Sequence, residues 1–319
     1  MIKFSAKILK YLDYIFVLRP SLFFAVWIIT LAGYHTSQHY YNGEATWLNL
    51  NFSLEILFYF TLITMASGAV FIFNQLQDVE SDKQNDKCFL LSEKYIDPKF
   101  ALKYALILSL LPLLIFLLID LQIFILLLIL ELLWGYFYNY PPFAWKDKPL
   151  MGVLTNLLAG FILFLIGWKM KSRVHTIAFY RFLPYMFAWG AVSILTTIPD
   201  MQGDQKQTKV TIALLLGRPT TIWVTLVMVI IGLILGIHAN DPIIYIAISL
   251  SLPFYIITAF KPVKAWVLRT IRFSVFFLAI LLVAAYPYFL IALIANFYLS
   301  RIYYKSRFDL VYPSFKVQE

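Results

Sequence analysis

Residues 74–82 read NQLQDVESD and follow directly on a long apolar run. Asn74, Asp78 and Asp82 are four residues apart, so on a helix they would lie along one face, whereas Glu80 would point away. Two carboxylates and an amide oxygen are ligands that Mg²⁺ accepts, usually with water and substrate phosphate completing its shell. The spacing therefore predicts a Mg²⁺ site at the end of this helix. The alternative is an acidic loop that only faces water.

A second acidic pair occurs at residues 199–204, which read PDMQGD. Asp200 and Asp204 would share one face if the segment after Pro199 is helical, and we expect Pro199 to break the preceding helix. Alone, this pair is also compatible with a solvated turn. Four Asp side chains brought together would repel, and divalent cations bridging to a diphosphate would relieve that repulsion. The two segments together predict a site that activates a diphosphate leaving group.

A basic residue lies in a third polar segment, YNYPPFAWKDKP at residues 138–149. Pro141 and Pro142 favour an extended turn there, with Tyr138 and Lys146 on either side of it. Lys146 could contact phosphate as a point charge, and an aromatic face such as that of Tyr138 could stabilise a cation. The alternative is that Lys146 is an ordinary positive charge of a membrane-protein loop.

The elements that position these segments must lie in lipid. Of the 319 residues 61% are hydrophobic and only 13% are charged, and mean hydropathy is +0.79. Apolar runs reach the roughly 20 residues that cross a bilayer. We expect an all-α, multi-pass integral membrane protein with about nine spans. The expected spans are residues 16–34, 54–74, 102–119, 121–138, 150–168, 180–198, 220–238, 241–259 and 274–299.

The distribution of charge predicts which side the polar segments face. If the N-terminus is cytoplasmic, 18 of the 26 Lys and Arg residues lie inside, although a basic cluster at 169–181 opposes this bias. The long loops 75–100, 139–149 and 199–219 are then all cytoplasmic. We expect the basic loops to contact anionic lipid head groups, with no nucleic-acid partner. The single Cys88 excludes an intrachain disulfide and a cysteine-based metal cluster.

The three segments, in this order, resemble the UbiA superfamily of intramembrane prenyltransferases. Members carry an Asn-x-x-x-Asp-x-x-x-Asp motif, a Tyr–Pro-Pro–Lys loop and a second Asp-x-x-x-Asp motif. The LRP at residues 18–20 resembles the opening of the family's first helix, and TKVTIALLLG at 208–217 resembles the stretch after its second motif. The resemblance covers nearly the whole chain.

The resemblance implies one domain over residues 1–319, with helices around a central cavity and a cytoplasmic cap formed by the loops after helices 2, 4 and 6. Members use Mg²⁺ to transfer a prenyl group from its diphosphate to an acceptor, here an aromatic compound, a quinone precursor or a lipid. By position, one metal would be held by Asn74, Asp78 and Asp82, and another by Asp200 and Asp204. Tyr138 and Lys146 would contact the diphosphate or the allylic cation, with Arg19 and Asn74 also binding substrate.

The chain departs from the family pattern at three places. Cys88-Phe89 and Ser92-Glu93 stand where members often have Arg-Pro and Ser-Gly, Ala144 stands where an Arg is frequent, and Thr208 stands where a Gly is frequent. These departures bear on which subfamily the chain resembles, and on some contacts with diphosphate, more than on the metal site. They leave open a terpene cyclase that uses the same ionisation.

A secondary transporter is the alternative from another class. Acidic residues at a membrane boundary and a weak internal repeat suit ion coupling. Among the acidic residues only Glu131 falls deep within an expected span. Glu131 could have a functional role in the transporter, or it could pair inside the helical bundle.

Overall fold

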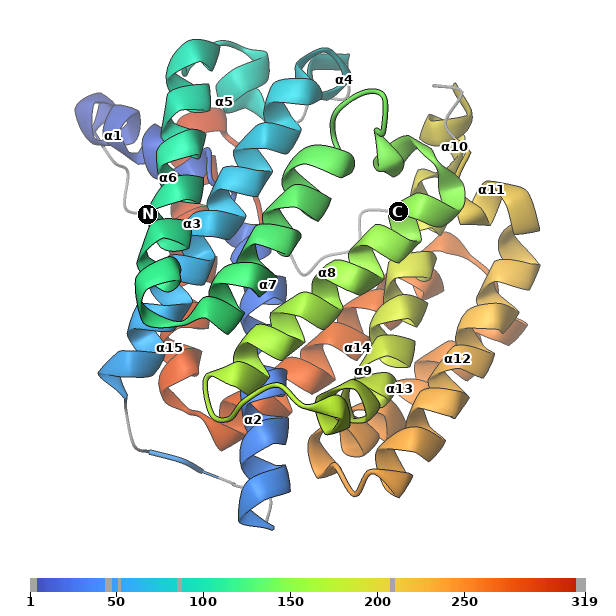
Figure 1. Cartoon of the computed structure of the whole chain (residues 1–319). Helices are drawn as coiled ribbons and strands as arrows, with labels where there is room; N and C mark the ends of the chain where they lie inside the picture. Colours follow the sequence, from blue (N-terminus) through green and yellow to red (C-terminus); the bar gives the residue numbers. More distant parts are fainter. Residues whose placement is uncertain (1–4, 44–47, 51–52, 85–87, 207–209, 314–319) are drawn as a thin grey trace. The chain divides into compact units, whose positions relative to one another are not determined.

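The structure is a computed structural model that describes residues 5–43, 48–50, 53–84, 88–206 and 210–313, and all regular elements in these ranges are helical (Figure 1). The expected all-α class is therefore confirmed. The chain divides into two compact units. The first comprises Met1–Trp27, Asn51–Pro141 and Tyr288–Lys316, and the second Ile28–Leu50, Pro142–Pro287 and Val317–Glu319. That the whole chain acts as a single domain stays a prediction.

Side-chain caps start several helices of the first unit. Ser53 and Asp97 each accept a hydrogen bond from the backbone N–H three residues later, and Asp120 accepts from both Gln122 and Ile123. These bonds satisfy amides that have no partner within the helix. The elements of this unit are α1 (Ala6–Phe16), η1 (Pro20–Leu22), α3 (Leu54–Gln77), α4 (Val79–Gln84), α5 (Phe89–Ser92), α6 (Pro98–Ile119), α7 (Leu121–Glu131), the π-helical η2 (Leu132–Phe137) and α15 (Tyr288–Phe308).

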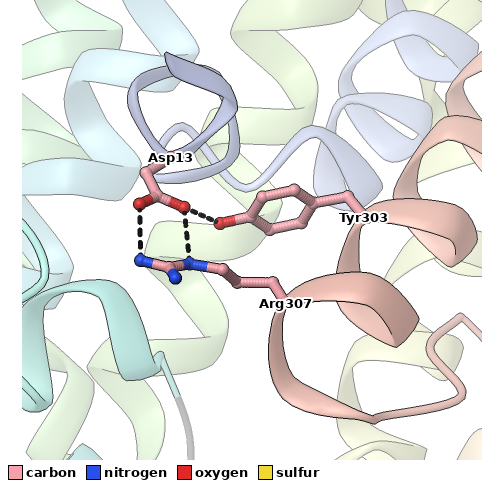
Figure 2. Close-up of polar contacts among 3 residues, drawn as sticks. All are labelled: Asp13, Tyr303 and Arg307. Atoms are coloured by element: carbon pink, nitrogen blue, oxygen red, sulfur yellow. Dashed lines mark hydrogen bonds and ion pairs between the residues drawn. The ribbon is translucent and has the colours of Figure 1, made fainter. Parts of the chain in front are cut away.

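The core of the first unit joins the two ends of the chain. The rings of Phe16 on α1 and Tyr303 on α15 stack with centroids 3.7 Å apart. Asp13 beside them accepts hydrogen bonds from Tyr303 and Arg307 (Figure 2). Helix α3 packs along α6, and the buried Gln75 on α3 donates to the carbonyl oxygen of Val17 at 2.8 Å. These contacts hold α3 in the core of the first unit.

The second unit contains the remaining helices. Helix α2 (Phe23–Asn42) begins in the first unit and continues into the second at Ile28. The other elements are η3 (Trp145–Asp147), α8 (Pro149–Lys169), α9 (Thr176–Leu195), α10 (Thr197–Lys206), α11 (Ile212–Leu216), α12 (Arg218–His238), α13 (Pro242–Phe260) and α14 (Lys264–Ala285). Prolines in the first turn of α8, α12 and α13 are favourable because those amides have no helical acceptor.

Two glycines allow α2 and α8 to approach closely in the second unit. A Cβ atom on Gly33 would overlap the carbonyl oxygen of Phe164, and one on Gly167 would overlap that of Thr30. Small residues at such crossings let helix backbones pack together in lipid, where packing drives association. The close approach of α2 and α8 therefore requires glycine at both positions.

The expected spans agree with the helices, with two corrections. Eight helical segments of the described chain are long and apolar enough to cross a membrane, and the expected fourth span is the shorter apolar segment Leu121–Phe137. The first expected span, 16–34, starts at the end of α1 and crosses η1, so its continuous helical part is α2 from Phe23 onward. The expected last span, 274–299, is wrong as a single helix because α14 ends at Ala285 and α15 begins at Tyr288, with Pro287 between them. A proline cannot continue the hydrogen-bond ladder of a preceding helix.

Candidate active site

The first acidic segment lies at the end of α3 in the first unit. Helix α3 ends at Gln77, Asp78 caps it, and α4 starts at Val79. The three residues are nevertheless one turn apart, because two backbone hydrogen bonds continue across the helix end. Asp78 N donates to Asn74 O at 3.0 Å, and Asp82 N donates to Asp78 O at 2.7 Å. The Asn74 amide nitrogen Nδ2 donates to Asp78 Oδ2 at 3.0 Å. Asn74 and Asp78 are thus together and half-buried, as the spacing predicted, while Glu80 is exposed.

Asn139 joins this pair, and the sequence interpretation missed it. Its side chain is 2% exposed, and its Oδ1 accepts a hydrogen bond of 2.8 Å from Asn74 Nδ2. Asn139 follows the π-helical turn η2, whose widened geometry is frequent at functional sites. The available sequence signal was an amide directly after a long apolar helix, where terminal carbonyls need donors. The partner 65 residues away could not be read from spacing.

Two tyrosines lie on either side of Asn139. Tyr138 is half-buried, and its backbone N–H closes the π-helical turn on Leu133 O at 2.9 Å. Burial raises the pKa of Tyr140, although a hydrogen bond with Gln77 at the end of α3 lowers it. Tyr140 is therefore in contact with the end of the helix that carries Asn74. The contact of Tyr138 with substrate stays a prediction.

Arg19 belongs to the same unit, at the turn between α1 and η1. Its backbone is left-handed, with φ 54°, and its side chain is half-buried. A non-glycine residue in the left-handed region of backbone conformation is strained, and such residues often occur at binding sites. The contact of Arg19 with diphosphate stays a prediction.

The second unit carries the other predicted residues. Lys146 is half-buried in η3, which leads into α8 at Pro149. Asp200 is exposed on α10, and Asp204 is one turn later in the same helical backbone, while its side chain lies outside the described part. Thr208 also falls outside the described residues. The convergence of these residues with the first acidic segment stays a prediction.

The expected helix break before Asp200 occurs earlier than Pro199. Helix α9 ends at Leu195, Thr196 forms a turn, and α10 starts at Thr197. Pro199 therefore lies in the first turn of a new helix, where its missing N–H leaves no bond unmade. At the break itself, the hydroxyls of Thr196 and Thr197 donate to the carbonyl oxygens of Ser193 and Ile194 near the end of α9, each at 2.7 Å.

The donor chemistry of the first unit fits part of a Mg²⁺ shell. Asn74 and Asp78 provide an amide and a carboxylate, which are hard oxygen ligands. The described residues contain no group of three or more His, Cys, Asp or Glu that could hold a metal ion. Oxygens from water and a substrate phosphate would have to complete such a shell, as is usual for Mg²⁺.

The buried Glu131 has a partner inside its own unit. Ser109 on α6 donates a hydrogen bond to Glu131 Oε2 at the end of α7. Pairing within the bundle, one of the two roles left open by the sequence, is therefore present.

Comparisons with known proteins agree with this architecture. The UbiA prenyltransferase family matches residues 21–281. A UbiA homolog from Archaeoglobus fulgidus bound to GPP and Mg²⁺ is 20% identical, with a TM-score of 0.63 over 84% of this chain and 97% of its own. A solved structure of a digeranylgeranylglyceryl phosphate synthase is 20% identical, with a TM-score of 0.67. The match covers 86% of this chain and 97% of that protein.

A third solved structure, a UbiA homolog from Aeropyrum pernix K1, is 13% identical, with a TM-score of 0.62 over 84% of this chain and 97% of its own. No curated protein sequence matches the chain. The family match extends over most of the chain and includes all three polar segments. The chain therefore belongs to the UbiA prenyltransferase family, a family of membrane-bound enzymes.

Proposed function

We propose that this protein transfers a prenyl group from a prenyl diphosphate to a hydrophobic acceptor, with Mg²⁺, and releases pyrophosphate. The observation that carries the proposal is the Asn74–Asp78 pair, an amide and a carboxylate joined at 3.0 Å where an apolar helix ends. Solved relatives at low identity are bound to GPP or DMAPP together with Mg²⁺, which supports the same substrate class here. The acceptor would be an aromatic compound, a quinone precursor or a lipid.

In the proposed reaction the bond between C1 of the prenyl group and the diphosphate oxygen breaks. The electron pair leaves with the diphosphate, and an allylic cation remains. The acceptor then donates an electron pair to C1 and loses a proton. Bound Mg²⁺ would neutralise the charge that develops on the leaving group. The chemistry therefore needs a site that binds diphosphate and excludes water from the cation.

The residues predicted from the sequence have the following roles in this proposal. Asn74, Asp78 and Asp82 would hold one cation, and Asp200 and Asp204 the other. Lys146 and Arg19 would donate to diphosphate oxygens, which gives charge-assisted hydrogen bonds. Tyr138 would present its ring to the allylic cation. The N-terminus and these residues would face the cytoplasm.

The test is a product analysis with membranes that contain the full chain. They are supplied with labelled geranyl, farnesyl and geranylgeranyl diphosphate, and products and pyrophosphate are measured with and without Mg²⁺. A prenylated acceptor and Mg²⁺-dependent pyrophosphate release are expected. A cyclic hydrocarbon formed without acceptor would identify a cyclase instead. Ion-driven uptake without pyrophosphate release at any chain length would overturn the enzymatic proposal.

A further inference from the structure

Asn139 occupies a buried position between two elements of the first unit. On one side its Nδ2 donates to the backbone carbonyl oxygens of Trp134 at 2.7 Å and Gly135 at 3.3 Å, both in η2. On the other side its Oδ1 accepts from Asn74 at the end of α3. One side chain therefore connects the π-helical turn to the first acidic segment.

These bonds fix the orientation of the Asn139 amide. Backbone carbonyl oxygens can only accept hydrogen bonds, so the NH₂ group of Asn139 must face Trp134 and Gly135. The oxygen of Asn139 must then face Asn74. A flipped amide would place its oxygen against the carbonyls and leave buried groups unpaired, which is costly.

The orientation of Asn139 in turn determines that of Asn74. The Asn74 Nδ2 group donates one hydrogen to Asn139 Oδ1 at 2.8 Å and the other to Asp78 Oδ2 at 3.0 Å. Both of its hydrogens are thus used. The carbonyl oxygen Oδ1 is then the part of the Asn74 amide left for a ligand. A cation binds an amide through its oxygen and is repelled by the NH₂ group.

We infer that Asn139 is a positioning residue that presents the Asn74 oxygen and the Asp78 carboxylate as a prepared pair of cation ligands. This inference rests on the proposed function, because it assumes that Asn74 and Asp78 bind a divalent cation. Outer partners of metal ligands commonly fix ligand orientation, and their loss weakens metal affinity about tenfold or more. Asn139 would act only through Asn74, without touching the cation.

The test measures cation binding directly, without turnover. Mn²⁺ replaces Mg²⁺, and its affinity for the purified full chain in detergent is measured by electron paramagnetic resonance. The variants are Asn139→Ala and Asn139→Leu, the second of which refills most of the volume so that a cavity does not dominate. We expect both to bind Mn²⁺ about tenfold more weakly than wild type.

The matched control is Gln75→Ala. Gln75 and Asn139 are both buried amides, each 2% exposed, and each donates to backbone carbonyls of its own unit. We expect Gln75→Ala to lower thermal stability as Asn139→Ala does, while leaving Mn²⁺ affinity unchanged. An equal loss of affinity in Gln75→Ala would mean that general destabilisation explains the effect, and the inference would be overturned.

Asn74→Ala and Asp78→Ala separate failure of this inference from failure of the metal site. If they lose Mn²⁺ affinity but both Asn139 variants bind like wild type, the positioning role is wrong and the metal site stands. If Asn74→Ala and Asp78→Ala also bind like wild type, the metal assignment is wrong and the positioning role falls with it. Should Asn139→Ala fail to fold, Asn139→Leu decides the question.

Discussion

Asp13 on α1 and Arg307 on α15 form a two-pronged ion pair, with Arg307 Nη2 2.9 Å from Asp13 Oδ2 and Nε 3.1 Å from Oδ1 (Figure 2). Tyr303 donates a third hydrogen bond, of 2.6 Å, to the same carboxylate. The Asp13 side chain is only 3% exposed. The pair thus joins residues 294 positions apart and holds the two ends of the first unit together.

Breaking this pair should destabilise the protein. Asp13→Asn and Arg307→Met each leave a partner uncompensated, and for a buried pair we expect a cost of about 3–5 kcal/mol. The measurement is the melting temperature of the purified protein in detergent. The double variant should be less destabilised than the sum of the single variants, because it leaves no unpaired charge.

An exposed pair at the C-terminal end of the same helix is the control, with Lys305 in α15 and Asp309 just after it. Lys305 and Asp309 are 2.6 Å apart, with side chains 36% and 87% exposed. Exposed pairs contribute about 0–1 kcal/mol, so Lys305→Ala should leave the melting temperature almost unchanged. Equal effects of Arg307→Met and Lys305→Ala would contradict the stabilising role of the buried pair.

The crossing of α2 and α8 gives a second prediction. Gly167→Ala places a methyl group against the Thr30 carbonyl, and since backbone cannot yield easily we expect a loss of about 2 kcal/mol or more. Gly152→Ala on the same helix is the control, because its added methyl would find its nearest atom, Trp145 O, at an ordinary 3.4 Å. Thermal unfolding of the two variants side by side is the measurement. A Gly167→Ala protein as stable as Gly152→Ala would show that the helices can separate without cost.

Much of this fold could be predicted from apolar runs alone, because lipid requires long continuous helices. The division of 274–299 could not, since hydropathy continues across the break at Pro287. Asn74 and Asp78 were predictable because both lie within one turn of the same segment. Asn139 was not, because its contact with Asn74 depends on how α3 packs beside η2.

The acidic segment itself gives a third prediction. Asp78→Asn keeps the size of the side chain but removes the charge that attracts a divalent cation. We expect turnover to fall by at least about 100-fold, with the Mg²⁺ concentration for half-maximal rate raised. Pyrophosphate release across a Mg²⁺ titration is the measurement. We expect Asp204→Ala to abolish turnover. Near-normal activity of either variant would show that the substituted residue does not belong to the metal site.

Glu80 is the control within the same segment. It is two residues from Asp78 and carries the same charge, but its side chain is exposed. Glu80→Gln therefore makes the same change in net charge as Asp78→Asn. We expect its rate and Mg²⁺ dependence to stay within about twofold of wild type, since exposed charges are strongly screened. A similar loss in both variants would mean that total charge, rather than a defined site, controls the rate.

The proposed orientation in the membrane can be tested at the two ends of α8. Lys148 caps its start, near Lys146, and Lys171 follows its end, and both side chains are exposed. In a Cys88→Ser background, Lys148→Cys and Lys171→Cys each provide a single thiol for a membrane-impermeant reagent. With a cytoplasmic active site, intact cells should label only Lys171→Cys, and inside-out vesicles only Lys148→Cys, because the reagent cannot cross the bilayer that α8 spans. The opposite pattern would place Lys146 and the basic loops outside and would contradict the orientation predicted from the distribution of Lys and Arg.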